Sequence, residues 1–248
     1  MTPSFSVAGK RVLITGASKG IGRSLALAFA AGGAQVLAAA RDLDKLQTLK
    51  AEIAALGGLC SVFVLDVADR ASREAAFAQI DALDVLINNA GVEKVTPSLG
   101  LDEATWDAIV DVNLKGAFFC AQAAAQRMSA GASIINMCSL TSEVGVPGAL
   151  PYGASKTGLV GMTRGLAAEW APLGIRVNGL GPGYFETDLT RPFYENPGWQ
   201  EAMLAKVPMG RLGHLDDLAG AALFLASQAS GYITGQVLYV DGGYLAGM

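Results

Sequence analysis

Short runs of β-branched and other apolar residues alternate with longer stretches rich in alanine and leucine along almost the whole chain. The short runs predict strands buried on both faces, because their apolar residues are largely continuous rather than alternating with polar ones. Seven strands are predicted: Arg11–Thr15, Gln35–Ala40, Ser61–Leu65, Val85–Asn88, Ser133–Cys138, Arg176–Leu180 and Gln236–Val240.

The longer stretches predict helices, each long enough to connect two parallel strands by a right-handed crossover. Strands that alternate with helices in this way predict an α/β fold, a doubly wound seven-stranded parallel sheet with helices on both faces. Ligands bind such sheets at the carboxyl ends of the strands. The predicted helices are Ile21–Ala31, Leu43–Leu56, Arg70–Ile80, Glu103–Met128, Tyr152–Ala171 and Leu215–Ala226.

One segment, 181–213, lacks this regular pattern. We interpret its part at about 184–213 as a lid, because the preceding strand ends where the ligand crevice should open. A surface loop with a packed helix is the alternative. The segment carries the aromatic residues Tyr184, Phe185, Phe193, Tyr194 and Trp199 among prolines that include Pro182, Pro192 and Pro197.

Composition and charge narrow the class of protein. The 248 residues are 52% hydrophobic and 16% charged, which favours a single domain over 1–248 with a large core. No apolar stretch approaches the roughly 20 residues that span a membrane, and the first residues lack the pattern of a signal peptide. The net charge of −4, without a basic cluster, disfavours nucleic acid as a partner.

The cysteines and the histidine give no metal-type spacing. Cys60, Cys120 and Cys138 lie among apolar residues and fit a reduced, cytoplasmic protein. Cys138 is expected to pack away from the substrate, because neighbouring strand residues point to opposite faces. His214, the single histidine, precedes a predicted helix and is interpreted as a surface or capping residue.

A glycine-rich turn connects the first predicted strand to the first predicted helix. Glycines there let the backbone approach a pyrophosphate, and the helix N-terminus offers N–H donors and a positive dipole end. From this turn alone, a phosphate cradle and an ordinary glycine-rich turn both remain open. The run reads Thr15-Gly16-Ala17-Ser18-Lys19-Gly20-Ile21-Gly22.

The spacing T-G-x-x-x-G-x-G differs from the common fingerprint G-x-G-x-x-G and resembles that of the classical short-chain dehydrogenases/reductases. This resemblance implies a Rossmann domain that exchanges a hydride between the nicotinamide of NAD(P)(H) and a ketone or secondary alcohol. Further motifs of the family follow in order: Asp66-Val67, Asn88-Asn89-Ala90-Gly91, Asn113, Ser139, Tyr152-x-x-x-Lys156, and Pro182-Gly183 through Thr187.

The resemblance also implies which residues bind the cofactor. Those expected near the phosphates are Gly16, Ser18, Lys19, Gly20, Ile21 and Gly22. Asp66 and Val67 are expected at the adenine, and Asn89, Ala90 and Gly91 along the adenosine side. Those expected to hold the nicotinamide amide are Pro182, Gly183, Phe185 and Thr187.

Tyr152 and Lys156 lie four residues apart in a predicted helix, so both fall on one face. A nearby ammonium lowers the pKa of a phenol from about 10 toward working pH, where a general acid/base is most effective. Tyr152 is therefore expected to protonate a ketone or deprotonate an alcohol. Ser139, at a strand end, is expected to hydrogen-bond the reacting oxygen. By resemblance, Lys156 also reaches the nicotinamide ribose, and Asn113 holds a water that connects Lys156 to solvent.

The residues after the second strand predict a preference for NADP(H), with NAD(H) also possible. Ala40 stands where a carboxylate would bond the ribose 2′-hydroxyl, so no acid repels a phosphate there. Arg41 follows directly and offers a bidentate donor, and Lys19 adds a second positive charge.

The substrate is a small molecule, and its expected contacts include Ser139, Tyr152 and Tyr184. Glu143 either reads a substrate hydroxyl or is a solvated loop charge. The opposite charges of Glu93 and Lys94, which follow the Asn-Asn-Ala-Gly motif, are expected to offset each other.

Motifs around the strand ends resemble the gluconate 5-dehydrogenase-like branch, which implies a polyol, ketose or sugar-acid-like substrate. The alternatives are a 3-oxoacyl thioester reductase, a broad carbonyl reductase and a non-catalytic nucleotide-sensing protein. The resemblance also implies a homotetramer. Independently, two predicted helices carry apolar residues on more than one face, which leaves one face to be buried against another chain. These residues are Ile109, Phe118, Leu159, Met162, Leu166 and Trp170.

Overall fold

The computed structural model describes residues 4–186 and 197–247. Its sheet has seven strands in the order β3-β2-β1-β4-β5-β6-β7, and every neighbouring pair is parallel. The predicted doubly wound sheet is therefore confirmed. The strands are β1 (Arg11–Thr15), β2 (Gln35–Ala40), β3 (Leu59–Val64), β4 (Leu83–Asn88), β5 (Met128–Met137), β6 (Arg176–Pro182) and β7 (Val237–Val240).

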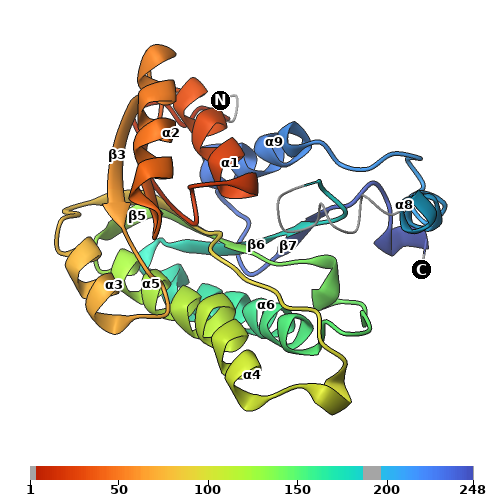
Figure 1. Ribbon diagram of the computed structural model, residues 1–248. Helices are drawn as coiled ribbons and strands as arrows, with labels where there is room; N and C mark the ends of the chain where they lie inside the picture. The colour runs from red at the N-terminus through yellow and green to blue at the C-terminus, as the bar shows by residue number, and fades with distance from the viewer. Residues whose placement is uncertain (1–3, 187–196, 248) are drawn as a thin grey trace.

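Helices cover both faces of the sheet, as Figure 1 shows. One face carries α1 (Gly20–Ala31), α2 (Leu43–Ala55) and α9 (Leu215–Ala226). The other carries α3 (Arg70–Phe77), α4 (Glu103–Val110), α5 (Ala117–Ala125) and α6 (Leu150–Trp170). A further helix, α8 (Pro197–Leu204), lies apart from the sheet at the edge of the molecule.

The two hydrophobic cores follow from the two-residue period of a strand. In β1, Val12 and Ile14 belong to the core under α1 and α9, whereas Leu13 belongs to the core under α5 and α6. All three side chains are fully buried. A strand buried on both faces must be apolar throughout, which is the pattern that predicted it.

The predicted helix over 103–128 is wrong in two respects. A π-helical turn, Asp111–Gly116, separates α4 from α5, and the helical region ends at Ala125. From Met128 onward the chain forms β5, which pairs with β4 through an irregularity in register between Leu83 and Val85. Strand pairing, a tertiary interaction, overrides the local helical pattern there.

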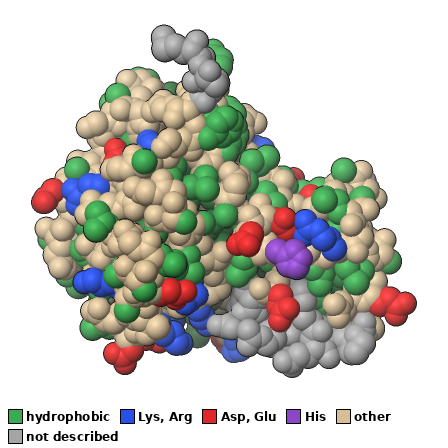
Figure 2. All heavy atoms as spheres, turned by 90° about the horizontal axis from the view of Figure 1, so that it is seen from above, with side chains coloured by type: hydrophobic (Ala, Val, Ile, Leu, Met, Phe, Trp, Pro, Cys, Tyr) green, Lys and Arg blue, Asp and Glu red, His purple; other side chains and the backbone are tan. Residues whose placement is uncertain are grey.

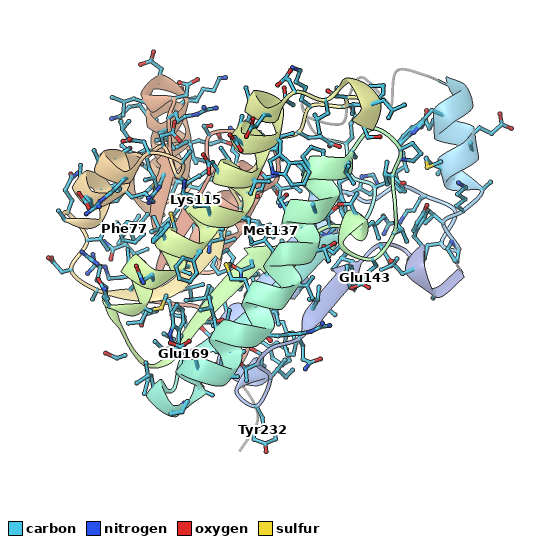
Figure 3. All side chains as sticks on the ribbon, turned by 90° about the horizontal axis from the view of Figure 1, so that it is seen from below. Phe77, Lys115, Met137, Glu143, Glu169 and Tyr232 are labelled. Atoms are coloured by element: carbon cyan, nitrogen blue, oxygen red, sulfur yellow. The ribbon has the colours of Figure 1, made fainter. Side chains whose placement is uncertain are left out.

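Some of the apolar residues that were expected to face a partner chain are buried within this chain, under the outer surface of α4, α5 and α6. Ile109, Leu159 and Leu166 are buried within the chain and are not available to a partner. The apolar side chains that remain partly exposed on this surface include Trp106 of α4 and Phe119 of α5, each 37% exposed. Figure 3 shows α4 and α5 end to end, with α6 alongside them, on the lower face of the molecule.

The surface and the described helices bear on the expectations about nucleic acid, membrane and metal binding. On the face seen in Figure 2, basic and acidic side chains are interspersed. Within the described residues no helix is long and apolar enough to cross a membrane, and no His, Cys, Asp and Glu side chains are grouped to hold a metal ion. His214 is the exposed N-cap residue of α9, and its backbone N–H donates to Asp217 at 2.8 Å, so the capping interpretation is confirmed.

The order of the strands positions the ligand crevice. β1 lies between β2 and β4, so successive crossovers run in opposite directions from this point. The loops that leave neighbouring strands on opposite faces separate there and open a crevice at the carboxyl ends. The glycine-rich turn after β1 and the Asn-Asn-Ala-Gly motif at the end of β4 lie in contact with each other at this edge of the sheet.

Candidate active site

A cavity of about 540 Å³ lies at the carboxyl ends of the strands. Cavities of this size hold cofactors and small ligands in many proteins. Its wall brings together most of the residues that the sequence predicted: Gly16, Ser18, Lys19, Gly20, Ile21, Arg41, Asp66, Val67, Asn89, Ala90, Gly91, Ser139, Tyr152, Lys156, Pro182, Gly183, Tyr184 and Phe185.

The glycine-rich turn has the geometry of a phosphate cradle. Gly16 and Gly20 have φ angles of +67° and +54°, in the left-handed region that favours glycine. A Cβ added at Gly16 would lie 2.9 Å from the Cα of Ala90 on the opposite loop. Lys19 caps α1, whose first N–H groups point toward the cavity end of the helix. These residues fit the pyrophosphate of a dinucleotide.

Gly22 has a different role from the one predicted, because it does not line the cavity. A Cβ there would collide with the carboxamide of Asn89 and with the carbonyl of Gly16. Its small size therefore permits the close packing of α1 against the turn rather than contact with a ligand.

Thr15 and Asn89 join the ends of β1 and β4. The Oγ1 of Thr15 accepts hydrogen bonds from the backbone N–H groups of Asn89 and Ala90, both at 3.0 Å. In return, the Nδ2 of Asn89 donates to the carbonyls of Thr15 at 2.9 Å and of Gly16 at 3.2 Å. The carboxamide of Asn89 thus holds the glycine-rich turn in place. The sequence did not predict this role for Thr15.

One end of the cavity carries three cationic side chains, Lys19, Arg41 and Lys45. The guanidinium of Arg41 lies 3.9 Å from the carboxylate of Asp66 and is 70% exposed, so it remains available to a ligand. Lys45, in the first turn of α2, lies 3.3 Å from Asp42. Sequence reasoning missed Lys45, although its place four residues after Arg41 in a predicted helix was visible.

Ser139, Tyr152 and Lys156 converge at the other end. Ser139 follows β5, and its Oγ accepts the N–H of Thr141 at 3.2 Å and hydrogen-bonds the phenol of Tyr152. Tyr152 lies in the first turn of α6. The Nζ of Lys156, one turn later, lies 5.4 Å from the centre of the Tyr152 ring and donates to the carbonyl of Met137 at 2.6 Å.

The expected effect of Lys156 on the pKa of Tyr152 is not observed. Burial raises the pKa of Tyr152, the Glu93 carboxylate raises it further, and the hydrogen bond from Ser139 opposes both. Burial also lowers the pKa of Lys156 to about 8. Helical spacing placed the two side chains on one face, but it could not report how deeply both would be buried.

Asn113 lies behind the cavity wall in the π-helical turn. Its Oδ1 accepts the N–H of Val92 at 2.8 Å, and its Nδ2 donates to the carbonyl of Val92 at 2.9 Å and to Ser155 at 3.2 Å. A Cβ added at Gly91 would lie 3.4 Å from Oδ1 of Asn113 and 3.7 Å from Nζ of Lys156. Asn113 and Lys156 therefore both lie close to Gly91.

Glu93 is a lining residue that the sequence underrated. Lys94 was expected to offset its charge, but the Nζ of Lys94 turns toward Thr105 of α4, 3.1 Å away. The carboxylate of Glu93 remains at the cavity, half-buried; burial raises its pKa, and the positive charge of Lys156 opposes this effect. The expected cancellation of charge is therefore wrong.

Glu143 does not line the cavity. It is exposed in the loop after β5, where it accepts a hydrogen bond from the Tyr239 hydroxyl of β7 at 2.7 Å (Figure 3). This position favours the solvated-loop alternative and removes Glu143 from the substrate contacts. Leu140 and Thr141 still line the cavity, and the loop has left it by Glu143, which the order of residues could not indicate.

Part of the predicted lid borders the cavity. Tyr184 lines it and packs edge-to-face on Trp199 of α8, which also lines it, with ring centres 5.5 Å apart. Thr187, predicted at the nicotinamide amide, lies outside the described residues. A lid over 184–213 remains a prediction.

The chain is similar to known dehydrogenases over nearly its whole length. A family profile described as "Enoyl-(Acyl carrier protein) reductase" matches residues 16–245. Gluconate 5-dehydrogenase of Gluconobacter oxydans is 38% identical, over 96% of both chains. The 3-oxoacyl-[acyl-carrier-protein] reductase FabG of Thermotoga maritima is 39% identical, over 95% of this chain and 97% of that one.

A polyol enzyme and a solved structure extend this comparison. Galactitol 2-dehydrogenase (L-tagatose-forming) of Cereibacter sphaeroides is 39% identical, over 97% of this chain and 96% of that one. The crystal structure of a gluconate 5-dehydrogenase from Burkholderia cenocepacia in complex with NADP and tartrate matches with a TM-score of 0.94. It is 40% identical, over 98% of this chain and 97% of that one.

These matches and the cavity together define the class of protein. The chain belongs to the short-chain dehydrogenase/reductase family, as its motifs predicted. It is an oxidoreductase that acts on CH–OH groups with a nicotinamide cofactor.

Replacing Lys156 by Met should stabilise the fold at neutral pH. Burial lowers the pKa of Lys156 from 10.5 to about 8, so the charged form costs folding free energy. This cost is full below pH 8 and fades as the pH rises from about 8 to 10.5. After the lost bond to Met137 is counted, we expect a gain of about 1–2 kcal/mol at pH 7.

Denaturant unfolding of Lys156→Met and wild type at pH 7 and pH 10 measures this effect. The difference in the free energy of unfolding should be largest at pH 7. An equal difference at both pH values would contradict a buried, charged Lys156.

Proposed function

We propose that this enzyme exchanges a hydride with a polyol, ketose or sugar-acid-like substrate, using Ser139, Tyr152 and Lys156 for the chemistry. The observation that carries the proposal is the convergence of these three side chains at one end of the cavity. The cationic cradle at the other end suits a dinucleotide phosphate. When bound there, a nicotinamide cofactor supplies or accepts the hydride.

Tyr152 holds the proton that a ketone oxygen gains on reduction. Its raised pKa keeps the phenol neutral at working pH, so it donates rather than accepts in this direction. The Ser139 hydroxyl, bonded to the phenol, is placed to bond the same substrate oxygen. Lys156, with a pKa of about 8, gains and loses a proton readily near neutrality and can return one to Tyr152.

Asn113 supports this proton return as a positioning residue. It fixes the backbone of Val92 through two hydrogen bonds. Its side chain and the Nζ of Lys156 both lie close to Gly91. A water held near that point would connect the ammonium with solvent, as the family resemblance implies.

The polar groups of the cavity favour a hydroxylated substrate over a long acyl chain. Glu93 and Tyr184 add an acceptor and a phenol to the wall beyond the catalytic residues. A buried substrate hydroxyl that finds no partner costs about 1–3 kcal/mol, so such groups serve a polyol better than an alkyl chain. Relatives named for gluconate and galactitol support the same choice.

A screen of carbonyl compounds tests the proposed substrate class. With NADPH, the substrates are 5-ketogluconate, several ketoses, simple and cyclic ketones, and an acetoacetyl thioester, ranked by kcat/KM. We expect a polyhydroxylated ketone to rank first. A thioester that leads by tenfold or more would instead select the acyl reductase alternative, for which a relative at 39% identity exists.

Tyr152→Phe is the control for catalysis in that screen. It removes only the phenolic oxygen, so turnover should fall on the order of 10²- to 10⁴-fold. Binding of NADPH, followed by its fluorescence, should change little. Turnover that persists in the folded variant would remove Tyr152 from the chemistry.

We propose a preference for NADP(H), set by Arg41, Lys45 and Lys19 with Ala40 in place of an acid. The relative from Burkholderia cenocepacia, crystallised with NADP, supports this choice. Ala40→Asp combined with Arg41→Ile should lower the NADPH/NADH ratio of kcat/KM by about 10- to 100-fold, because a phosphate loses a bidentate partner and meets a carboxylate. Arg70→Ile, at an exposed position of α3 outside the cavity, is the matched control. A wild type that favours NADH would refute the assignment.

We propose a cytoplasmic homotetramer. Trp106 of α4 and Phe119 of α5 are each partly exposed and offer apolar side chains to a second copy, and three unpaired cysteines fit a reducing compartment. Light scattering at micromolar concentration should give four times the mass of the 25.5 kDa chain. Trp106→Glu should shift the mass toward smaller species, and a monomeric wild type would contradict the proposal.

A further inference from the structure

The loop that carries Glu93 borders the substrate end of the cavity. It follows Gly91, whose added Cβ would lie 3.7 Å from the Nζ of Lys156. Farther along, the backbone N–H of Thr96 donates to the carbonyl of Gly148 at 2.8 Å, in the loop that leads into α6 and Tyr152. The loop that carries Glu93 therefore runs from beside the catalytic lysine to the segment before the catalytic tyrosine.

The carboxylate of Glu93 has no hydrogen-bond or ion-pair partner among the described residues. Within residues 4–186 and 197–247 it makes neither a hydrogen bond nor a salt bridge, and the adjacent Lys94 is engaged by Thr105. Burial raises the pKa of Glu93, and the Lys156 ammonium opposes this effect. A half-buried carboxylate that lines a cavity and lacks a protein partner can accept hydrogen bonds from a ligand.

Charge is distributed unequally between the two ends of the cavity. Lys19, Arg41 and Lys45 line the cofactor end together with the carboxylates of Asp42 and Asp66, which leaves one net positive charge there. At the substrate end, the described wall offers one cation, Lys156, and its Nζ already bonds Met137 beside Tyr152. A substrate that carries a carboxylate would therefore meet Glu93 without a cation of its own among the described residues.

We propose that Glu93 is a specificity-determining residue that selects neutral polyhydroxylated substrates over sugar-acid anions. This inference rests on the proposed function and narrows it to polyols and ketoses. A hydroxyl donating to a carboxylate forms a charge-assisted bond, about twice as strong as a neutral one. An anionic substrate in the same place gains no such bond and is repelled by the like charge.

The test compares two ketones that differ only at one terminal carbon, which is neutral in one and carries a negative charge in the other. L-Sorbose and 5-keto-D-gluconate share a carbon skeleton and a ketone position, and one carries a hydroxymethyl group where the other carries a carboxylate. If another ketose leads the substrate screen, it and its terminal acid form the pair. The wild type should reduce the neutral member with the higher kcat/KM, and a tenfold preference for the anion would overturn the proposal.

Glu93→Gln removes the charge but keeps the size of the side chain. The neutral-to-anion ratio of kcat/KM should fall about tenfold, because repulsion of the anion is lost while the amide can still bond hydroxyls. Any effect of Glu93 on the pKa of Tyr152 acts on both substrates and cancels in this ratio, as do differences in their open-chain fractions. A ratio that changes less than twofold would overturn the proposal.

Glu103→Gln is the matched control, because Glu103 is exposed in the first turn of α4 and does not line the cavity. It should leave the ratio at the wild-type value. Thermal unfolding and NADPH titration check that each variant is folded. If Glu93→Gln does not fold, the neutral-to-anion ratio of kcat/KM of the wild type alone tests the proposal. If neither ketone is reduced while the acetoacetyl thioester is, the proposed function has failed. If both are reduced and the ratio ignores Glu93, only this inference has failed.

Discussion

The registration of β1 against β4 is the constraint on which the rest of the site depends. Val12 pairs with Val85 and Ile14 with Ile87, which brings Thr15 level with the turn after Asn88. Thr15 and Asn89 then exchange hydrogen bonds across the gap, so the glycine-rich turn and the loop before Glu93 form one structural unit. A shift of one residue would turn every side chain to the opposite face and separate these partners. Cofactor cradle and substrate wall are therefore fixed by the same pair of strands.

The buried Lys156 lowers the stability of the fold in exchange for a group that can take part in the reaction. Lys156 is 4% exposed and makes one hydrogen bond, to a backbone carbonyl, within the described residues. An apolar side chain would suit that position better, because charge is costly to bury. The large double-sided core around β1 and its neighbours supplies the stability that permits this placement. A perturbed pKa at a cleft is a common mark of function.

Local patterns predicted what depends on neighbouring residues, and missed what depends on packing. The glycine spacing and the four-residue interval between Tyr152 and Lys156 are local, so both were predictable. The Thr15 contacts, the π-helical turn around Asn113 and the placement of Glu93 are set by elements far apart in the sequence. The pKa of Tyr152 was expected in the wrong direction for the same reason, since burial is a property of the whole fold. Glu143 was a plausible contact by order along the chain, but its loop turns toward β7.

The separation of charge along the cavity has a consequence for how such an enzyme can diverge. Lys19, Arg41 and Lys45 come from the first fifth of the chain, whereas Glu93 comes from the loop after β4 and Trp199 from α8. Substitutions at positions with no shared partners usually contribute additively. An enzyme with this fold could therefore change its cofactor preference without changing the range of carbonyl substrates that it accepts. It could also gain new substrates without changes in the nucleotide site. Cofactor preference and substrate preference can therefore change separately, although both sites are anchored on β1 and β4.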